Sequence, residues 1–231
     1  MQKIDDTRLR DFYYKKYNMD QLFDESLVNE LEVMKFNRLE YLCREEEPMN
    51  YLMFFVEGKA KVFRTLANGK NLLISFYAPF EVMGEVELLE ERSTSCTAQA
   101  LSTCYVLALD MSKARAKLSE DVSFLKFTCN ILAEKLHNLG TNSSINLFYP
   151  LENRLASYIL ITSVRVKDKE GQEQLVFLEN LTHLSELLGT SYRHLLRTLN
   201  SLCKNNIITK DKKGYIIKDL VGLEDLAEDL F

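Results

Sequence analysis

The hydrophobic pattern of this chain changes near residue 112, and that change restricts the folds that the chain can adopt. From about residue 36 to 110, short extended runs alternate with turn signals. Asn68-Gly69 is typical of a two-residue β-hairpin turn, and residues 97–109 have the pattern of one last long strand. Many short strands spaced by about 8–12 residues predict an antiparallel sandwich or barrel. We expect a helix over roughly residues 20–34 ahead of this region.

Beyond residue 112 the pattern becomes helical, and one helix, from about residue 121 to 146, carries two apolar faces. The first face repeats at alternating spacings of four and three residues, as a coiled-coil seam does, and comprises Leu125, Cys129, Leu132, Leu136 and Leu139. The second comprises Phe124, Phe127 and Ile131. A helix with two apolar faces needs two partners. The predicted sandwich can cover one face and a second copy of the helix the other, with packing inside a single chain as the alternative.

The last quarter of the chain holds the most informative pattern. Asn180 can cap a short helix that ends at Gly189, and Ser191 can cap a second helix over residues 192–203. Two helices joined by a short turn that contains glycine form a helix-turn-helix. Two apolar runs with a basic tip between them follow, and they predict a hairpin wing at residues 207–209 and 215–217.

The distribution of charge indicates a partner that the total charge does not. The chain has 29 Lys and Arg against 34 Asp and Glu, and a net charge of −5 by itself argues against nucleic acid. Between Gly189 and Lys218, however, there are seven basic residues and one acidic residue, so this segment carries +6 and the rest of the chain −11. We therefore expect double-stranded DNA as a partner. The side chains suited to reading base edges are Tyr192, Arg193, His194 and Arg197. Those suited to contacting DNA phosphates are Thr190, Ser191, Lys210, Lys212 and Lys213.

Several classes of function find no support in the sequence. No GxSxG, HExxH, Walker A or GxGxxG motif occurs, and the predicted barrel has no histidine for a metal site, so we do not expect an enzyme. Five cysteines without a CxxC pair argue against a zinc or iron–sulfur centre, and we expect reduced thiols and no cofactor. No apolar stretch is long enough for a membrane span and no secretory signal is visible, which leads us to expect a cytoplasmic protein.

Together these motifs resemble the CRP/FNR family of bacterial transcription regulators, and within it the YeiL branch. The resemblance covers roughly residues 25–220 and rests on the run from Leu188 to Arg197, on Gly84-Glu85 and on Gln99-Ala100. It implies an α+β fold and a homodimer that binds a palindromic operator and works with RNA polymerase. The implied parts are an N-terminal helix with a cyclic-nucleotide-binding-like β jelly roll (1–112), a long dimerisation helix (113–148) and a C-terminal winged helix-turn-helix (149–231).

The resemblance also implies an effector pocket, but one that departs from the cyclic-AMP-binding members of the family. Its candidate residues are Gly84, Glu85, Thr94 and Ser95. Glu85 matches the glutamate that holds the ribose in those members, whereas Thr94 and Ser95 stand where an Arg-Ser pair binds the cyclic phosphate. Without that guanidinium, we do not expect cyclic AMP to bind, and any small-molecule effector is unknown. The alternative function is a regulatory module that binds a small molecule or a protein and has no DNA-binding activity.

Overall fold

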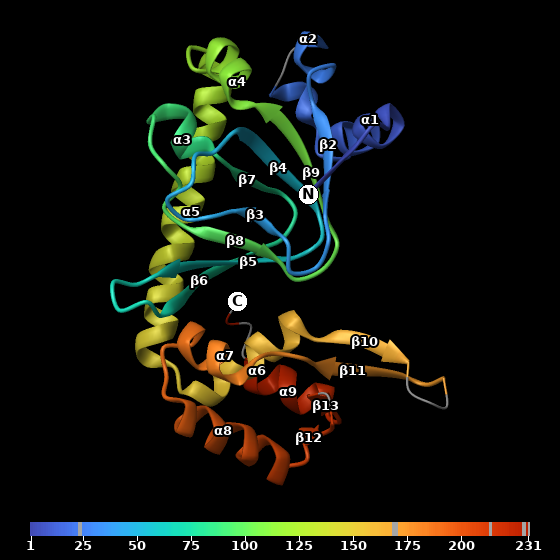
Figure 1. Cartoon of the computed structure of the whole chain (residues 1–231), viewed down its shortest axis with the longest axis vertical. Helices are drawn as coiled ribbons and strands as arrows, with labels where there is room; N and C mark the ends of the chain where they lie inside the picture. The colour runs from blue at the N-terminus through green and yellow to red at the C-terminus, as the bar shows by residue number, and fades with distance from the viewer. Residues whose placement is uncertain (23–24, 168–170, 213, 228–229, 231) are drawn as a thin grey trace. The chain divides into compact units, whose positions relative to one another are not determined.

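The computed structural model describes residues 1–22, 25–167, 171–212, 214–227 and 230. The chain divides into two compact units, which are described separately below (Figure 1). The first comprises Met1–Arg64 and Ile74–Leu139, and the second comprises Thr65–Leu73 and Gly140–Phe231. One division therefore falls inside the long helix, whereas we expected the domain boundaries at its two ends. Among the described residues, no helix is long and apolar enough to cross a membrane.

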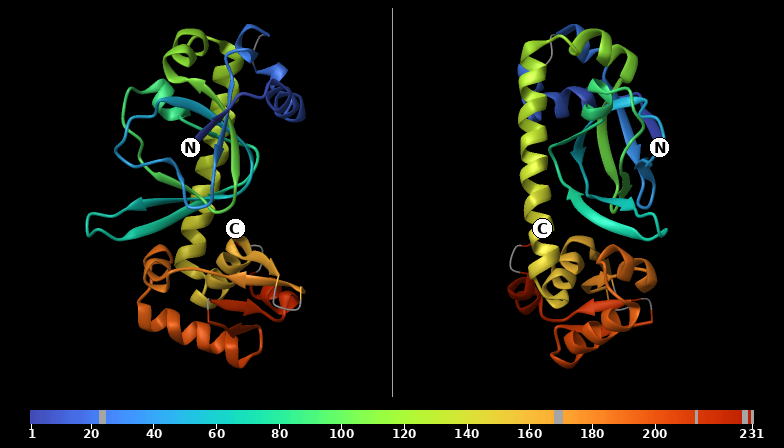
Figure 2. Two further views of the ribbon diagram at one scale, coloured as in Figure 1. Left: turned by 45° about the vertical axis from the view of Figure 1, so that its right-hand side comes forward. Right: turned by 90° about the vertical axis from the view of Figure 1, so that its left-hand side faces the viewer.

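The first unit is built on two antiparallel sheets that enclose one core, which is the jelly roll expected from the sequence (Figures 1 and 2). One sheet has the strand order β1 (Gln2–Ile4), β2 (Glu32–Phe36), β9 (Cys104–Asp110), β4 (Tyr51–Glu57), β7 (Glu81–Met83). The other has the order β3 (Tyr41–Cys43), β8 (Thr97–Ala100), β5 (Ala60–Thr65), β6 (Asn71–Tyr77). Phe54, Phe55 and Leu107 are fully buried in this core. Strand β4 is apolar over most of its length because both of its faces are covered.

The N-terminal segment differs from the sequence prediction, and the expected helix over residues 20–34 is wrong. The segment forms α1 (Thr7–Lys16), the 3-10 helix η1 (Met19–Gln21), α2 (Glu25–Val28) and then strand β2. Leu27, Leu31 and Met34 have helical spacing, which made the segment look like one helix. In the structure, β2 pairs with β9 from Glu32 to Phe36, so backbone pairing with a distant strand overrides the local pattern.

Two further details of the barrel correct the prediction. Residues 97–109 form two strands, β8 and β9, that belong to different sheets, because the chain passes from one sheet to the other at residues 101–103. Asn68-Gly69 does lie in a hairpin, between β5 and β6, but its loop has three residues rather than two. The Leu66 N–H donates to the Lys70 carbonyl at 2.7 Å, and Gly69 adopts a φ of +77°. Such a loop is a type I turn followed by a left-handed glycine.

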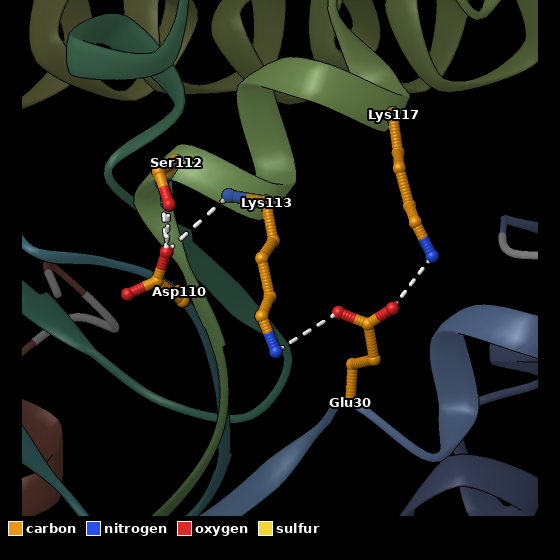
Figure 3. A network of polar contacts seen from close by, with 5 residues as sticks. All are labelled: Glu30, Asp110, Ser112, Lys113 and Lys117. Atoms are coloured by element: carbon orange, nitrogen blue, oxygen red, sulfur yellow. Dashed lines mark hydrogen bonds and ion pairs between the residues drawn. The ribbon is translucent and has the colours of Figure 1, made fainter.

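A short helix, α4 (Met111–Leu118), follows the jelly roll and is held by charged contacts (Figure 3). The Asp110 carboxylate caps the helix by accepting from the backbone N–H groups of Ser112 at 3.0 Å and Lys113 at 3.3 Å. The Glu30 carboxylate pairs with the ammonium groups of Lys117 at 2.6 Å and Lys113 at 3.2 Å, and these groups lower its pKa. The segment 113–148, which the domain prediction assigned to dimerisation, thus contains most of α4 as well as the long helix that was predicted over about residues 121–146.

The long helix α5 (Val122–Phe148) carries the two apolar faces that the sequence predicted. On one face, Phe124 is buried, and Phe127 and Ile131 pack against the jelly-roll core. The coiled-coil seam on the other face is exposed or half-exposed throughout, and comprises Leu125, Cys129, Leu132, Leu136 and Leu139. Leu136 is 71% exposed and Leu139 is 45% exposed. The jelly roll therefore covers only one of the two faces.

The second unit combines a small antiparallel sheet with helices. Its strands, in sheet order, are β10 (Val164–Lys167), β11 (Glu173–Phe177), β13 (Tyr215–Ile217) and β12 (Ile208–Lys210). Its helices are the end of α5, then α6 (Leu151–Thr162), α7 (Leu181–Leu187), α8 (Tyr192–Lys204) and α9 (Leu220–Ala227). Leu155, Leu195 and Leu223 are fully buried, so side chains of α6, α8 and α9 are closed off from solvent.

Candidate nucleic-acid interface

The turn between α7 and α8 is fixed by backbone hydrogen bonds that its sequence favours. The Gly189 N–H donates to the Glu186 carbonyl at 2.9 Å, and the Thr190 N–H donates to the Ser185 carbonyl at 2.9 Å. Gly189 has a φ of +61°, which completes the pattern of a Schellman helix end. At the other end of α7, the Asn180 side chain accepts from two backbone N–H groups, so both predicted helix limits are confirmed.

Helix α8 begins at the predicted cap and is held on its inner side by leucines. The Ser191 hydroxyl accepts from the His194 backbone N–H at 3.2 Å, and the Thr190 hydroxyl lies 3.3 Å from the His194 ring Nδ1. Leu195, Leu199 and Leu202 are fully buried. Because one face of α8 is fixed in the core, the opposite face is presented in a defined orientation.

The outer face of α8 holds all four residues predicted to read DNA bases. Tyr192, Arg193, His194 and Arg197 are exposed at the start of the helix. Within the described part of the chain, neither the Arg193 nor the Arg197 guanidinium forms a hydrogen bond or an ion pair. Folding therefore leaves two cations on this face that no described carboxylate neutralises, which is the arrangement expected of a surface that binds an anionic partner.

The predicted wing is a hairpin of β12 and β13. Thr209 lies opposite Ile216, Lys210 lies opposite Tyr215, and the Asp211 N–H donates to the Gly214 carbonyl at 2.8 Å. The side chains of Lys210 and Lys212 are exposed at its tip. The remaining predicted phosphate contact, Lys213, lies outside the described residues. Strand β13 also pairs with β11, so the wing is an extension of the sheet rather than an isolated hairpin.

Gly214→Ala is expected to destabilise the wing and the sheet that carries it. A Cβ at Gly214 would lie 2.2 Å from the Phe177 carbonyl oxygen of β11, a backbone atom that cannot move aside without disturbing the sheet. We expect a loss of about 1–3 kcal/mol in the free energy of unfolding, measured by urea denaturation. Gly140→Ala is the control, because a methyl group there meets nothing within 4 Å. Equal stability of the two variants would contradict this assignment.

Arg154 on α6 is a residue of this region that the sequence analysis missed. Its guanidinium donates to the Leu188 carbonyl at 2.9 Å and to the Asn146 side-chain oxygen at 3.3 Å. Burial lowers the pKa of this group, and its Nε has no partner among the described residues. Arg154 therefore joins the end of α5 to the turn of the helix-turn-helix. The sequence did contain a signal for this role, because Arg154 is a basic residue next to Leu155, among the regularly spaced apolar residues of α6.

In the first unit, Gly84 and Glu85 lie at the start of α3 (Glu85–Leu89). Gly84 has a φ of +94°, and a Cβ there would lie 2.8 Å from the Tyr51 carbonyl oxygen, so the position requires glycine. Glu85 is only 4% exposed. Its Oε1 lies 2.7 Å from Nζ of Lys135 on α5, so the carboxylate that matches the ribose-binding glutamate is already paired.

The other two candidate effector residues have different surroundings. Thr94 is buried and its hydroxyl is within hydrogen-bonding distance of the Arg44 and Glu47 carbonyls, so it fixes a turn. Ser95 is exposed. Neither residue brings a positive charge. Among the described residues, no group of three His, Cys, Asp or Glu side chains is arranged to hold a metal ion.

Comparison with known proteins agrees with this geometry. Two family models match the chain, a cyclic nucleotide-binding domain over residues 33–121 and a Crp-like helix-turn-helix domain over residues 153–226. The regulatory protein YeiL of Escherichia coli O157:H7 is 35% identical over 191 residues, which cover 83% of each chain. The cyclic AMP receptor protein of Thermus thermophilus is 25% identical over 176 residues, which cover 76% of this chain and 79% of that protein.

Solved structures show the same fold. A transcriptional regulator of the CRP/FNR family from Eubacterium rectale has a TM-score of 0.75 at 12% identity, covering 94% of this chain and 99% of its own. A second regulator of that family, from Thermus thermophilus, has a TM-score of 0.66 at 19% identity, covering 85% of this chain and 98% of its own. These four relatives are named as regulators or receptors, and none is named as an enzyme.

Proposed function

The chain belongs to the CRP/FNR family of DNA-binding transcriptional regulators, and from this membership we propose that it acts as a homodimer on a palindromic operator. The observation that carries the proposal is the outer face of α8. Two exposed guanidinium groups without described partners stand at the start of a helix whose inner face is fixed. The second helix of a helix-turn-helix lies in the major groove with its first residues toward the bases.

Each predicted contact residue that the structure describes has a role that its position supports. Arg193 and Arg197 carry donors that match the O6 and N7 acceptors of guanine, and Tyr192 and His194 flank them. His194 is bonded through its ring to Thr190 and through its backbone to Ser191, so this end of the helix has little freedom. We assign Thr190 and Ser191, with the wing lysines Lys210, Lys212 and Lys213, to the DNA phosphates.

The experiment that tests DNA binding uses the full chain. An operator selected from a random library is compared with a scrambled duplex by fluorescence anisotropy across a range of salt concentrations. We expect sequence-specific binding whose affinity falls steeply as salt rises, because counterions are released from the phosphates that the protein neutralises. Weak binding that does not respond to salt would instead favour the alternative function, a regulatory module that acts through protein or small-molecule contacts.

The proposal of a homodimer is based on the exposed seam of α5. Its seam is exposed while its opposite face is buried against the jelly roll, so the seam is apolar surface left for a partner. The heptad spacing along it suits a second copy of the same helix in a parallel coiled coil. A symmetric dimer also presents two recognition helices to two half-sites, with a spacing of one helical turn of DNA or a multiple of it.

Oxidation is expected to link two copies of the chain through Cys129. In a parallel coiled coil, each seam residue faces its own copy across the symmetry axis. Cys129 is a seam residue and is exposed, whereas Cys43, Cys96, Cys104 and Cys203 are buried or half-buried. Copper-phenanthroline treatment should therefore give a covalent dimer on non-reducing gels, and Cys129→Ser should abolish it, with Cys203→Ser as the control. A dimer band that persists in Cys129→Ser would count against pairing along this seam.

The remaining parts of the proposal follow from these. The sensor domain is degenerate for cyclic AMP, because Glu85 is paired with Lys135 and neither Thr94 nor Ser95 offers a charge to a phosphate. RNA polymerase is proposed as a further partner, as befits a transcriptional regulator. We place the protein in the bacterial cytoplasm, where its DNA and polymerase partners are found.

A further inference from the structure

The ammonium group of Lys135 lies in a site with three different kinds of partner. Its Nζ is 2.7 Å from Oε1 of Glu85 and 2.6 Å from the Val82 carbonyl oxygen, and it lies over the Tyr77 ring at 5.3 Å from the centroid. A carboxylate, a carbonyl and an aromatic face are the groups that recognise an organic ammonium ion. The Glu85 side chain is 6% exposed and that of Lys135 is 25% exposed, so the pair is largely removed from water.

The surroundings of this site favour a cation over an anion. Two further carboxylates, Glu81 and Glu87, interact electrostatically with both Glu85 and Lys135. Burial is the main cause that raises the pKa of each, with the negative charge of Glu85 adding to it. Arg92 acts on Glu87 from an exposed position. Arg115 donates to the Glu87 backbone carbonyl and pairs with the exposed carboxylate of Glu91, not with the Glu87 carboxylate. The Lys135 ammonium is already bound to Glu85 and to the Val82 carbonyl, so a phosphate at Glu85 would otherwise meet acceptors where it needs donors.

We propose that Lys135 is the resident ligand of the sensor domain and that the site it fills is specific for a primary ammonium group. An effector of this domain is then an amine that competes with Lys135 for Glu85, not a cyclic nucleotide. Lys135 stands on α5, next to the seam residue Leu136 but on the side of the helix toward α3. An amine that displaced Lys135 from Glu85 would loosen α5 from the jelly roll. The effect of this displacement on DNA binding rests on the function proposed above.

Thermal unfolding of the full chain tests the site without DNA. Lys135→Ala and Lys135→Met are expected to lower the unfolding temperature by roughly 5–10 °C, because each leaves Glu85 buried without its partner. Lys135→Met replaces the four-carbon stem of the lysine by an unbranched apolar side chain of the same number of atoms and serves where the alanine variant folds poorly. Lys126→Ala removes one exposed charge from the same helix and should leave the unfolding temperature unchanged.

Chemical rescue identifies the ligand class. Truncation of Lys135 to alanine removes three methylene groups beyond Cβ together with the ammonium, so n-propylammonium should bind the vacated site. It should reverse at least half of the decrease in unfolding temperature that Lys135→Ala causes. Tetramethylammonium at the same concentration has no N–H donor and should reverse little of it. In the double variant Glu85→Gln, Lys135→Ala, the rescue should disappear because the carboxylate that receives the ammonium is gone.

Three results would overturn the proposal. They are wild-type unfolding temperatures in both Lys135 variants, rescue by tetramethylammonium equal to that by n-propylammonium, and stabilisation of the wild-type chain by cyclic AMP. Because none of these measurements involves DNA, they distinguish failure of this site from failure of the DNA-binding proposal. If the site is confirmed, the operator affinity of the Lys135→Met protein then reports whether its occupancy controls DNA binding.

Discussion

Arg193→Ala is expected to weaken binding to the preferred operator by about 5- to 150-fold, or about 1–3 kcal/mol, with little change on random DNA. Arg193 lies two residues beyond the helix cap Ser191, is exposed, and forms no hydrogen bond or ion pair with any described residue. Its removal therefore takes away donors to a base edge without disturbing a folded contact. Competition against operators changed at single positions should show relaxed preference at one base pair in each half-site.

Lys212→Ala is the matched control for this variant. Lys212 is an exposed cation at the wing tip, where a contact to phosphate carries no sequence information. Its loss should weaken binding to all sequences alike and flatten the log–log salt slope by about one unit. The same behaviour is expected of Lys213, which lies outside the described residues. If Arg193→Ala left the base preference of the protein unchanged, its assignment to base readout would be wrong.

Leu136→Glu is expected to convert the protein to a monomer and to lower its operator affinity by about 100-fold or more. A glutamate in the seam places two negative charges face to face in the dimer and removes an apolar contact. Leu136 is 71% exposed in the single chain, so the substitution costs the fold of each copy little. Without the dimer, each half-site is bound singly, and the gain of about 10²–10⁴ from linking two binding events is lost.

Asn130→Glu provides the control for the seam substitution. Asn130 is exposed on the same helix but lies outside the seam. The glutamate of Asn130→Glu therefore adds the same charge without facing the second copy. Light scattering during size-exclusion chromatography should show a dimer for Asn130→Glu and a monomer for Leu136→Glu, with far-UV circular dichroism unchanged in both. A Leu136→Glu protein that remains dimeric would place the interface somewhere other than α5.

Short-range signals predicted the DNA-binding half of the chain well. The caps at Asn180 and Ser191 and the left-handed Gly189 are confirmed at the expected positions. Each of these features depends on residues within five positions of one another, since a helix end is settled by its own side chains and backbone groups. The amphipathic spacing of α8 also predicted correctly which side is buried, and therefore which side is free to contact DNA.

The same kind of signal failed in the first unit, where pairing partners are far apart. Residues 32–36 looked helical by local spacing but pair with β9, about seventy positions away. Residues 97–109 looked like one strand, yet they divide between two sheets. Periodicity reports which positions are apolar over a short window, but it does not identify the strand that will lie beside them.

By itself, the sequence determined the class of the protein: a helix-turn-helix with a basic outer face, a seam helix with two apolar sides, and a barrel made of short strands. All of these follow from period, capping and charge, which act between near neighbours along the chain. Only the tertiary structure decided that Glu85 is paired with Lys135, fifty residues away, and that Arg154 joins Leu188 to Asn146. Such contacts exist only once folding has brought distant segments together and excluded water from them, because only then does a charged or polar side chain need the particular partner that the fold supplies.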